Sequence, residues 1–324
     1  MTQLTIEEHL TEHDRRATLV ADARAGLTST PKRLSPIWFY DERGSALFDE
    51  ITRLPEYYPT RAERGLLAAN ASEIAELAGA DTLVELGSGT SDKTRLLLDA
   101  LVLRDGRCRY VPLDVDATTL LAAAHSLTEA YPGLDVHAVA GDFHQHLDRL
   151  PTDGRRLVAF LGSTIGNLRP DERRRFLGDL DCCMTSFDRL LLGVDLVKDV
   201  GRLRAAYDDA AGVTAEFNRN ALRVVNRELD ATFDADGFDH VARWVPDAAW
   251  IEMRLRARAA QDVKIGALDL VVHFEADEEI LTEISAKFTV DGVTAELFDS
   301  GFIVERTWKA GEDDFLLVLA RPYC

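Results

Sequence analysis

The stretch TLVELGSGTSDKT, over residues 82–94, constrains the fold of this chain more than any other part of its sequence. Its apolar start has the character of a short strand. Gly87 and Gly89 interrupt the run, and the amphipathic segment KTRLLLDAL follows. A strand, a tight turn and a helix in this order are typical of a unit that binds a nucleotide-like ligand, although a turn without a ligand also fits the pattern.

The residue before Lys93 separates the ligand classes. A phosphate-binding P-loop requires a glycine there and a dinucleotide-binding turn requires a small residue, but this chain has Asp92. The negative charge of the Asp92 carboxylate would repel a phosphate. S-adenosylmethionine has a cationic centre, an amino-acid tail and no phosphate, so the turn favours this methyl donor, which the glycines allow to approach the backbone.

The composition excludes several classes of function. The chain has 324 residues and a formal net charge of −19, without a basic run, so nucleic acid is an unfavourable partner. Its polar start and the absence of a long apolar run predict a soluble, cytoplasmic protein that does not contact a membrane. The four cysteines, Cys108, Cys182, Cys183 and Cys324, form no CxxC pair and indicate neither disulfides nor zinc.

Strand-like and helix-like runs alternate between about residues 62 and 195. The strand-like runs are TLVEL, RYVPLD, LDVHAVA, RLVAFLG and RLLLGVD. This alternation predicts an α/β fold, a Rossmann-like and mostly parallel sheet with helices on both faces. Near the C-terminus, FIVERTW and DFLLVLA, joined by the turn KAGED, predict an antiparallel hairpin that completes this sheet.

A different pattern interrupts the alternation. Residues 198–229 suggest consecutive helices, and DHVARWV, AWIEMRLRA and ALDLVVHF suggest longer strands of an antiparallel sheet. We therefore expect a discontinuous main domain over residues 61–198 and 287–324. Residues 1–60 and 199–286 are expected to form a second, α+β domain that binds the substrate.

Candidate ligand-binding residues follow the strand-like runs, where open parallel sheets bind ligands. Asp114 is spaced from the glycine turn as an acid that binds ribose hydroxyls would be, with Asp116 as its competitor. Asp142 and Phe143 suit an adenine amine and ring, or equally a helix N-cap followed by a core aromatic. The segment GSTIGN, over residues 162–167, suits a substrate.

Other motifs carry less weight. His9 and His13 are four residues apart in a charged, helix-like segment, and His144 and His146 follow Asp142, but supporting ligands for a metal are absent from the pattern. No GxSxG nucleophile elbow occurs, so hydrolase chemistry is not indicated.

Seven segments together resemble one known family. They are WFYDERGSALFDEITRLPEYYPTR, VELGSGTSDKT, LDVD, GDF, FLGSTIGN, AAYDDAAGVTAEFNRN and LTEISAKF, in one order from about residue 22 onward. The family is that of the S-adenosylmethionine-dependent L-histidine Nα-methyltransferases, which form hercynine (Nα-trimethylhistidine) in ergothioneine biosynthesis. The joint match is far more specific than any single motif.

The resemblance implies a role for each matched residue. The positions that match the S-adenosylmethionine site are Tyr40, Gly87, Lys93, Asp114, Asp142 and Phe143. The positions that match the L-histidine site are Tyr57, Gly162, Asn167, Tyr207, Glu283 and Ser285. Lys93, at a helix start, would pair with the cofactor carboxylate. Asn167 and Tyr207 would hold the α-amino-carboxylate end of histidine, while Glu283 and Ser285 would bond its imidazole nitrogens.

Glu283 and Ser285 bear on substrate choice. Two residues two apart face one ligand only at a helix start or in an extended segment, and we expect a helix N-terminus here. An indole has one ring N–H and no second nitrogen, so these residues favour histidine over tryptophan. An N-methyltransferase of tryptophan or another aromatic amino acid is the alternative enzyme. A catalytically silent binding protein would have broken cofactor positions, and none is broken.

The implied reaction is an in-line methyl transfer to the neutral α-amine, in which positioning matters more than a strong base. Tyr40 would orient the amine or accept its proton. The rings of Tyr40 and Phe217 could favour cationic character, although Phe217 also suits a core position. We expect a monomer without a metal.

Overall fold

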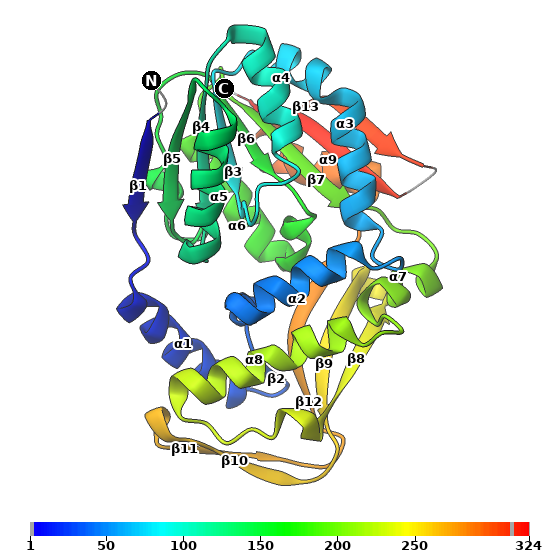
Figure 1. Cartoon of the computed structure of the whole chain (residues 1–324). Helices are drawn as coiled ribbons and strands as arrows, with labels where there is room; N and C mark the ends of the chain where they lie inside the picture. Colours follow the sequence, from blue (N-terminus) through cyan, green and yellow to red (C-terminus); the bar gives the residue numbers. More distant parts are fainter. Residues whose placement is uncertain (1–2, 312–313, 324) are drawn as a thin grey trace. The chain divides into compact units, whose positions relative to one another are not determined.

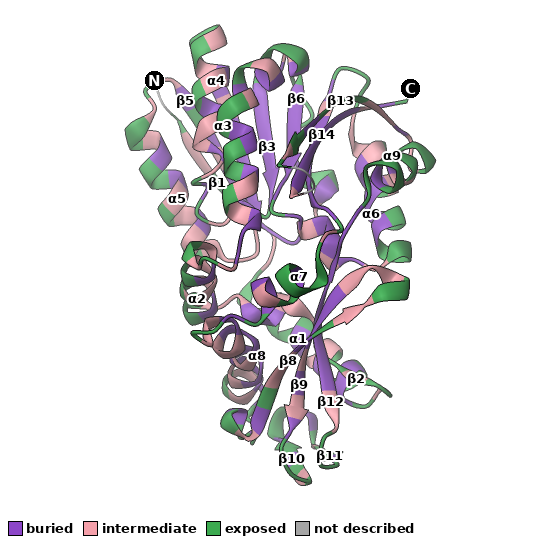
Figure 2. Cartoon of the chain, turned by 90° about the vertical axis from the view of Figure 1, so that its right-hand side faces the viewer, coloured by how far each residue is buried: buried purple, intermediate pink, exposed green. Residues whose placement is uncertain are grey.

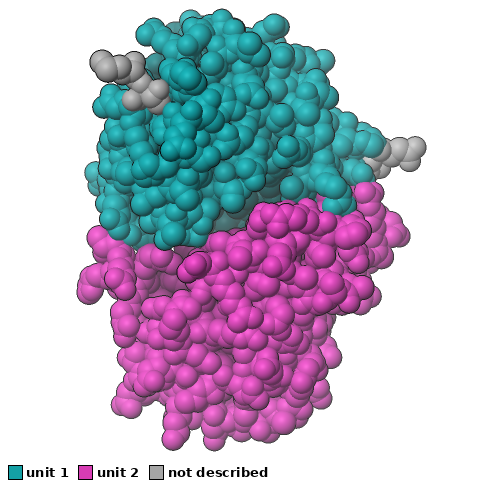
Figure 3. Space-filling view, viewed as in Figure 1, with its two compact units in different colours: residues 1–10, 59–197, 287–324 teal, residues 11–58, 198–286 magenta. Residues whose placement is uncertain are grey.

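The computed structural model describes residues 3–311 and 314–323 of the chain. The chain divides into two compact units, which are coloured separately in Figure 3. Unit 1 comprises residues 1–10, 59–197 and 287–324, and unit 2 comprises residues 11–58 and 198–286. Each unit is therefore assembled from segments that lie far apart in the sequence. Cys324 and two residues of the expected KAGED turn lie outside the described residues.

Unit 1 is built on an eight-stranded sheet (Figure 1). The strands, in spatial order, are β1 (Leu4–Glu8), β5 (Leu134–Ala140), β4 (Cys108–Asp114), β3 (Thr82–Leu86), β6 (Arg156–Phe160), β7 (Arg189–Asp195), β14 (Phe315–Pro322) and β13 (Phe302–Ala310). The first six strands are parallel, and β14 and β13 add an antiparallel hairpin. This is the α/β, Rossmann-like class I methyltransferase sheet that the sequence predicts, and its C-terminal hairpin is confirmed as well.

Helices cover both faces of this sheet (Figure 2). They are α3 (Pro59–Ala78), α4 (Arg95–Asp105), α5 (Ala117–Ala130), α6 (Pro170–Cys183) and α9 (Val290–Asp299), with short 3-10 turns η2 (Leu147–Arg149) and η3 (Thr164–Asn167). One core cluster joins Leu67 of α3, Leu98 of α4 and Leu127 of α5 to the strands. All five residues of β3 are buried, as expected for a strand inside a parallel sheet covered on both faces.

The edge strand β1 differs from the expectation that residues 1–60 belong to the second domain. The first ten residues group with unit 1, because β1 pairs in parallel with β5. His9 follows this strand, and the helix that contains His13 begins only at Glu12. The expectation of one helical segment carrying both histidines is therefore wrong.

Unit 2 combines helices with a four-stranded sheet of order β2-β12-β9-β8. Its helical elements are α1 (Glu12–Leu27), η1 (Pro36–Phe39), α2 (Glu42–Arg53), α7 (Val200–Tyr207), α8 (Val213–Leu229), η4 (Ala235–Gly237), η5 (Pro246–Ala248) and η6 (Gly266–Leu268). Its strands are β2 (Lys32–Arg33), β8 (Phe238–Val245), β9 (Trp250–Ala257), β10 (Gln261–Ile265), β11 (Leu270–Phe274) and β12 (Glu279–Ala286).

The strand pairing in unit 2 corrects one part of the sequence prediction. β8 and β9 are antiparallel neighbours as expected, but β11 forms a separate hairpin with β10. The next strand of the four-stranded sheet is β12, which pairs with β9. None of the helices that the structure describes is long and apolar enough to cross a membrane.

Candidate active site

The glycine turn is tied to the neighbouring strand β4 by its backbone. The amides of Gly87 and Ser88 donate to the carbonyl of Leu113 at 2.8 and 3.2 Å. Gly87 and Gly89 have φ values of +71° and +49°, which side chains other than glycine rarely adopt. A Cβ added at either glycine would meet no described atom within 4 Å. The turn thus leaves open space beside its backbone, as the approach of a ligand requires.

Asp114 closes this turn at the end of β4. Its two carboxylate oxygens accept hydrogen bonds from the amides of Gly89 at 2.8 Å and Asp116 at 2.9 Å. Burial raises the pKa of Asp114. Asp116 instead caps α5, because its side chain accepts from the amides of Thr118 and Thr119 at 3.1 and 3.2 Å. The two acids are therefore distinguished, and Asp114 is the one held beside the glycines, with acceptor capacity left for hydroxyl groups.

Asp142 and Phe143 follow β5. Asp142 is buried and accepts from the amide of His144 at 2.9 Å and from the side chain of Gln145 at 3.2 Å. The ring of Phe143 lies 5.2 Å from that of Phe160, between centroids. Asp142 therefore orders a turn and does not cap a helix, because the next helical element, η2, begins only at Leu147 with His146 at its N-cap. Phe143 is half-buried and is not a core aromatic. Adenine binding stays a prediction for both residues.

Lys93 has a partner that the sequence pattern does not reveal. It lies two residues before α4, in the turn rather than in the helix, and its amine forms an ion pair with the carboxylate of Glu63 on α3. The Glu63 side chain is fully buried. Its other carboxylate oxygen accepts from the amide of Gly162 at 2.7 Å. No signal in the helical pattern AERGLL separates this acid from an exposed one.

A second buried acid lies next to this group. Glu85 on β3 accepts from the hydroxyl of Thr94 at 2.6 Å and from the hydroxyl of Tyr110. The Tyr110 hydroxyl also lies 2.8 Å from that of Ser91. Burial raises the pKa of Glu85 to about 7. The residues behind the glycine turn are therefore a connected polar network, not an apolar core.

The loop after β6 contains Gly162 and Asn167. Gly162 and Ser163 both have positive φ, at 75° and 58°, and the turn η3 ends at Asn167. The hydroxyl of Ser163 accepts from the amide of Asp195 at 3.0 Å, which fixes the loop to the end of β7. Gly162 is exposed and Asn167 is half-buried. Both belong to unit 1, as do all the predicted cofactor positions except Tyr40.

The remaining predicted substrate residues belong to unit 2. Glu283 and Ser285 lie on β12, so the expectation of a helix N-terminus is wrong and the extended alternative is observed. Residues two apart in a strand point to the same face, so Glu283 and Ser285 can still face one ligand. The Ser285 hydroxyl lies 2.7 Å from the hydroxyl of Tyr207, and Glu283 is buried.

Aromatic rings gather beside Tyr207. Tyr57 lies edge-on to Tyr207, with ring centroids 6.2 Å apart, and Tyr40 lies edge-on to Phe217 at 5.5 Å. Phe48 contacts the rings of Tyr40, Tyr57 and Phe217. The structure thus brings Tyr40, Tyr57 and Tyr207 into one aromatic cluster within unit 2. Phe217 is buried in this cluster, which agrees with its core role.

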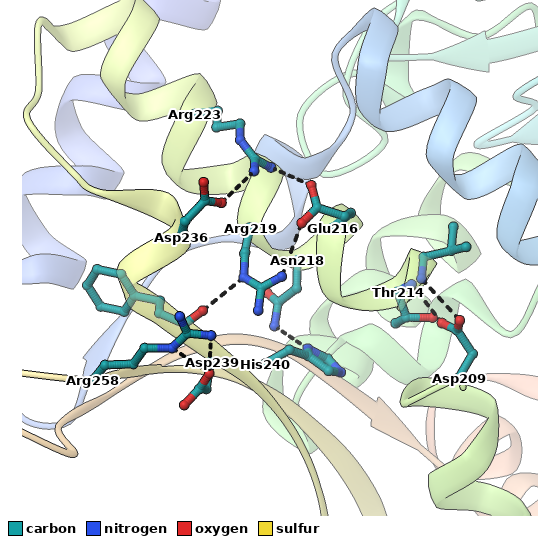
Figure 4. A network of polar contacts seen from close by, with 12 residues as sticks. Asp209, Thr214, Glu216, Asn218, Arg219, Arg223, Asp236, Asp239, His240 and Arg258 are labelled. Carbon is teal, nitrogen blue, oxygen red and sulfur yellow. Dashed lines mark hydrogen bonds and ion pairs between the residues drawn. The ribbon is translucent and has the colours of Figure 1, made fainter. Parts of the chain in front are cut away.

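A polar network that includes the contact between His240 and Asn218 (Figure 4) supports the main chain at Tyr207. The Nε2 atom of His240 lies 2.7 Å from the Tyr207 carbonyl, and its Nδ1 atom lies 2.8 Å from Asn218 Nδ2. Asn218 in turn accepts from the hydroxyl of Thr282, the neighbour of Glu283, at 2.7 Å. Burial lowers the pKa of His240. The network therefore connects α7 to β12, the two elements that carry Tyr207 and Glu283.

Comparison with known proteins identifies close relatives. A family model described as "Histidine-specific methyltransferase, SAM-dependent" matches residues 19–322. The histidine N-alpha-methyltransferase of Mycolicibacterium smegmatis is 56% identical over 317 residues, which cover 98% of this chain and 99% of the relative. The protein of the same name from Mycobacterium tuberculosis is 55% identical over 318 residues, with the same shares covered. Ergothioneine biosynthesis protein 1 of Neurospora crassa is 32% identical over 212 residues, 64% of this chain and 24% of that protein.

Proposed function

We propose that this chain, which belongs to the family of histidine-specific, S-adenosylmethionine-dependent methyltransferases, is an L-histidine Nα-methyltransferase. It transfers three methyl groups to the α-amino group of L-histidine and forms hercynine, the first step of ergothioneine biosynthesis. The observation that carries this proposal is identity of 56% and 55% to two histidine N-alpha-methyltransferases over 98% of the chain.

The residues of unit 1 fit S-adenosylmethionine as the methyl donor. Open space beside Gly87 and Gly89 and the oriented carboxylate of Asp114 suit a sugar with two hydroxyls and no phosphate. Lys93 would hold the carboxylate of the donor, and Asp142 with Phe143 would hold its adenine. When bound, S-adenosylmethionine supplies an activated methyl group on a sulfonium.

The residues of unit 2 fit the imidazole of histidine. Glu283 and Ser285 share one face of β12, and the buried carboxylate of Glu283 suits an imidazole N–H as its partner. The Ser285 hydroxyl is held in place by that of Tyr207, 2.7 Å away. Tyr57 belongs to the same aromatic cluster. We assign the amino-carboxylate end of histidine to Asn167 and Tyr207, with Gly162 on the same loop as Asn167.

Residues of the chain orient the α-amine of histidine and accept its proton. The α-amine attacks as a neutral nucleophile, so an N–C bond forms while the S–C bond breaks and the ammonium proton must leave beforehand. We assign Tyr40 to orient the amine or to accept this proton. The ring of Tyr40 would also favour a cationic amine, by roughly 0.5–2 kcal/mol, whereas Phe217 is buried in the aromatic cluster.

One assay tests the proposed reaction. The purified protein is incubated with S-adenosylmethionine and histidine, and separately with tryptophan, and the products are measured by mass spectrometry. We expect a gain of three methyl groups on histidine. If tryptophan gained methyl groups and histidine gained none, the enzyme would be the alternative aromatic-amino-acid N-methyltransferase.

Replacing the buried acid of β12 tests the assignment of the imidazole site. Because Glu283→Ala removes the partner of an imidazole N–H, we expect the KM for histidine to rise at least about tenfold, the effect of one lost charge-assisted hydrogen bond. Binding of S-adenosylhomocysteine, measured by calorimetry, should stay within about twofold. Glu275→Ala, which removes an exposed acid of unit 2, is the matched control. Equal losses in histidine and cofactor binding would contradict the assignment of Glu283.

A monomeric state and a cytoplasmic location complete the proposal. The four cysteines, which form no CxxC pair, support a reducing compartment. Light scattering should give the mass of a single chain.

A further inference from the structure

Glu63 is a buried charged residue of unit 1 to which the proposed reaction gives no role. Its side chain on α3 is fully inaccessible to solvent. One carboxylate oxygen pairs with the amine of Lys93, and the other accepts from the amide of Gly162 at 2.7 Å. The two partners come from different loops, the turn after β3 and the loop after β6. A single carboxylate therefore connects a predicted cofactor residue to a predicted substrate residue.

The sheet makes room for this carboxylate. A Cβ added at Gly193 in β7 would lie 2.1 Å from Glu63 Oε1 and 3.2 Å from the ring of Phe315. Gly193 has no positive φ, so space rather than backbone conformation requires a glycine there. Helix α3 therefore carries the carboxylate, and the missing side chain at Gly193 leaves room for it against the sheet.

The burial of Glu63 makes both contacts energetically significant. A buried carboxylate is costly unless an opposite charge and hydrogen-bond donors satisfy it. Lys93 supplies the charge, and Gly162 supplies a donor. Movement of the turn that carries Lys93 would leave the buried carboxylate without an opposite charge, and movement of the Gly162 loop would leave one of its oxygens without a donor.

We propose that Glu63 is a positioning residue that fixes the Lys93 amine and the Gly162 loop in one arrangement. The inference rests on the proposed function, in which Lys93 meets the donor carboxylate and Gly162 belongs to the substrate loop. Glu63 acts through these two residues, because its side chain is fully buried and each of its carboxylate oxygens contacts one of them.

Two substitutions separate the two contacts. Glu63→Gln keeps an oxygen that accepts from the Gly162 amide but removes the negative charge opposite Lys93. We expect the dissociation constant for S-adenosylhomocysteine to rise about tenfold and the KM for histidine to change by less than threefold. Glu63→Ala removes both contacts, so both constants should rise about tenfold or more.

A double-substitution cycle distinguishes positioning from a general effect on folding. Lys93→Gln alone should weaken S-adenosylhomocysteine binding, and adding it to Glu63→Gln should cause little further loss, because the first change already disturbs the same amine. Glu76→Gln on the exposed face of α3 is the matched control and should leave both constants unchanged. Circular dichroism and melting temperatures establish that each variant is folded.

The outcomes decide the proposal. If folded Glu63→Gln and Glu63→Ala bind S-adenosylhomocysteine and use histidine within twofold of the wild type, Glu63 has no positioning role. Fully additive effects of Glu63→Gln and Lys93→Gln would also overturn it. If Glu63→Ala does not fold, the cycle with Glu63→Gln still decides. Calorimetric binding of S-adenosylhomocysteine needs no acceptor substrate. A wild type that binds it but fails to methylate histidine would therefore refute the proposed function. The binding measurements would still test the role of Glu63.

Discussion

The proton on His240 is defined by its two neighbours. The Tyr207 carbonyl can only accept, so Nε2 at 2.7 Å must donate. Nδ1 then accepts from Asn218 Nδ2 at 2.8 Å, a contact drawn in Figure 4. A second proton on the ring would meet the N–H of Asn218. This geometry agrees with the lowered pKa of His240, which burial causes. The neutral ring is therefore the form that supports α7.

We predict that His240 makes the protein less stable in acid. Because its pKa is lower in the folded protein than in the unfolded chain, the unfolded chain binds the proton first as the pH falls below about 6.5. The stabilising contribution is present above that pH and is lost as the pH falls through the folded pKa. His240→Gln should cost about 1–2 kcal/mol at pH 7.5, from one lost hydrogen bond, but its free energy of unfolding should fall less between pH 7 and pH 5.

His273 provides a control of opposite sign. Its pKa is raised by Asp262 and Glu275 on the surface, so it stabilises below its unfolded pKa and ceases to do so as the pH rises. Urea unfolding of the wild type, His240→Gln and His273→Gln at several pH values makes the comparison. A fall between pH 7 and pH 5 as steep in His240→Gln as in the wild type would contradict the role of His240.

Single residues also show where prediction from sequence ends. Asp114 could be placed because its spacing from the glycines follows from strand and turn geometry. Glu63 could not, because its burial results from packing of α3 against two loops that lie 30 and 99 residues further along the chain. Periodicity describes one helix at a time and contains no information about which of its acids meets a lysine from another segment.

At the scale of elements, β12 shows why a local pattern misleads. The spacing of Glu283 and Ser285 allows a helix start or a strand, and pairing with β9 decides in favour of the strand. Ser285 and Glu283 lie opposite Ile251 and Met253 in that register. The runs that form β3 to β7 are apolar enough to be recognised alone, whereas β1 and β12 become strands through their partners.

An ion pair joins the starts of strands β6 and β7. We expect it to contribute to the stability of the fold but not to ligand binding. Arg156 and Asp188 are almost fully buried, with a shortest N–O distance of 2.7 Å. Although burial alone would raise it, hydrogen bonds from Arg156 and Thr185 hold the pKa of Asp188 below its usual value. Asp188→Asn should lower the free energy of unfolding by about 3–5 kcal/mol, because it leaves the Arg156 charge buried without its partner.

The location of this pair makes the prediction selective. The predicted ligand residues of unit 1 follow the carboxyl ends of the parallel strands, whereas Arg156 and Asp188 lie at or just before their amino ends. At 15 °C, folded Asp188→Asn should therefore keep the wild-type KM for histidine and for S-adenosylmethionine. Asp153→Asn, at an exposed acid that pairs with Arg109, should change stability by less than about 1 kcal/mol. A raised KM in Asp188→Asn without a loss of stability would refute this division of roles.

At the scale of the whole molecule, the discontinuous main domain was foreseeable because the alternating pattern stops near residue 198 and a hairpin of the same sheet returns after residue 287. The predicted cofactor positions belong to unit 1, except Tyr40, and four of the six predicted substrate positions belong to unit 2. The sequence could not assign the first ten residues, since a five-residue, half-polar strand needs its partner β5 to be recognised.

The net charge of −19 leads to a last prediction that concerns the whole chain. S-adenosylmethionine has a net charge of about +1 at neutral pH, whereas S-adenosylhomocysteine, which lacks the sulfonium, is close to neutral. A strongly acidic protein attracts the cation at long range, and salt screens this attraction, with a Debye length of about 10 Å at 0.1 M and 3 Å at 1 M. Raising KCl from 20 to 500 mM should therefore increase the KM for S-adenosylmethionine roughly three- to tenfold. The dissociation constant for S-adenosylhomocysteine, which has the same adenosyl and amino-acid groups, should change by less than about twofold. Equal salt dependence of the two constants would mean that local contacts alone, and not the overall charge, select the methylated donor.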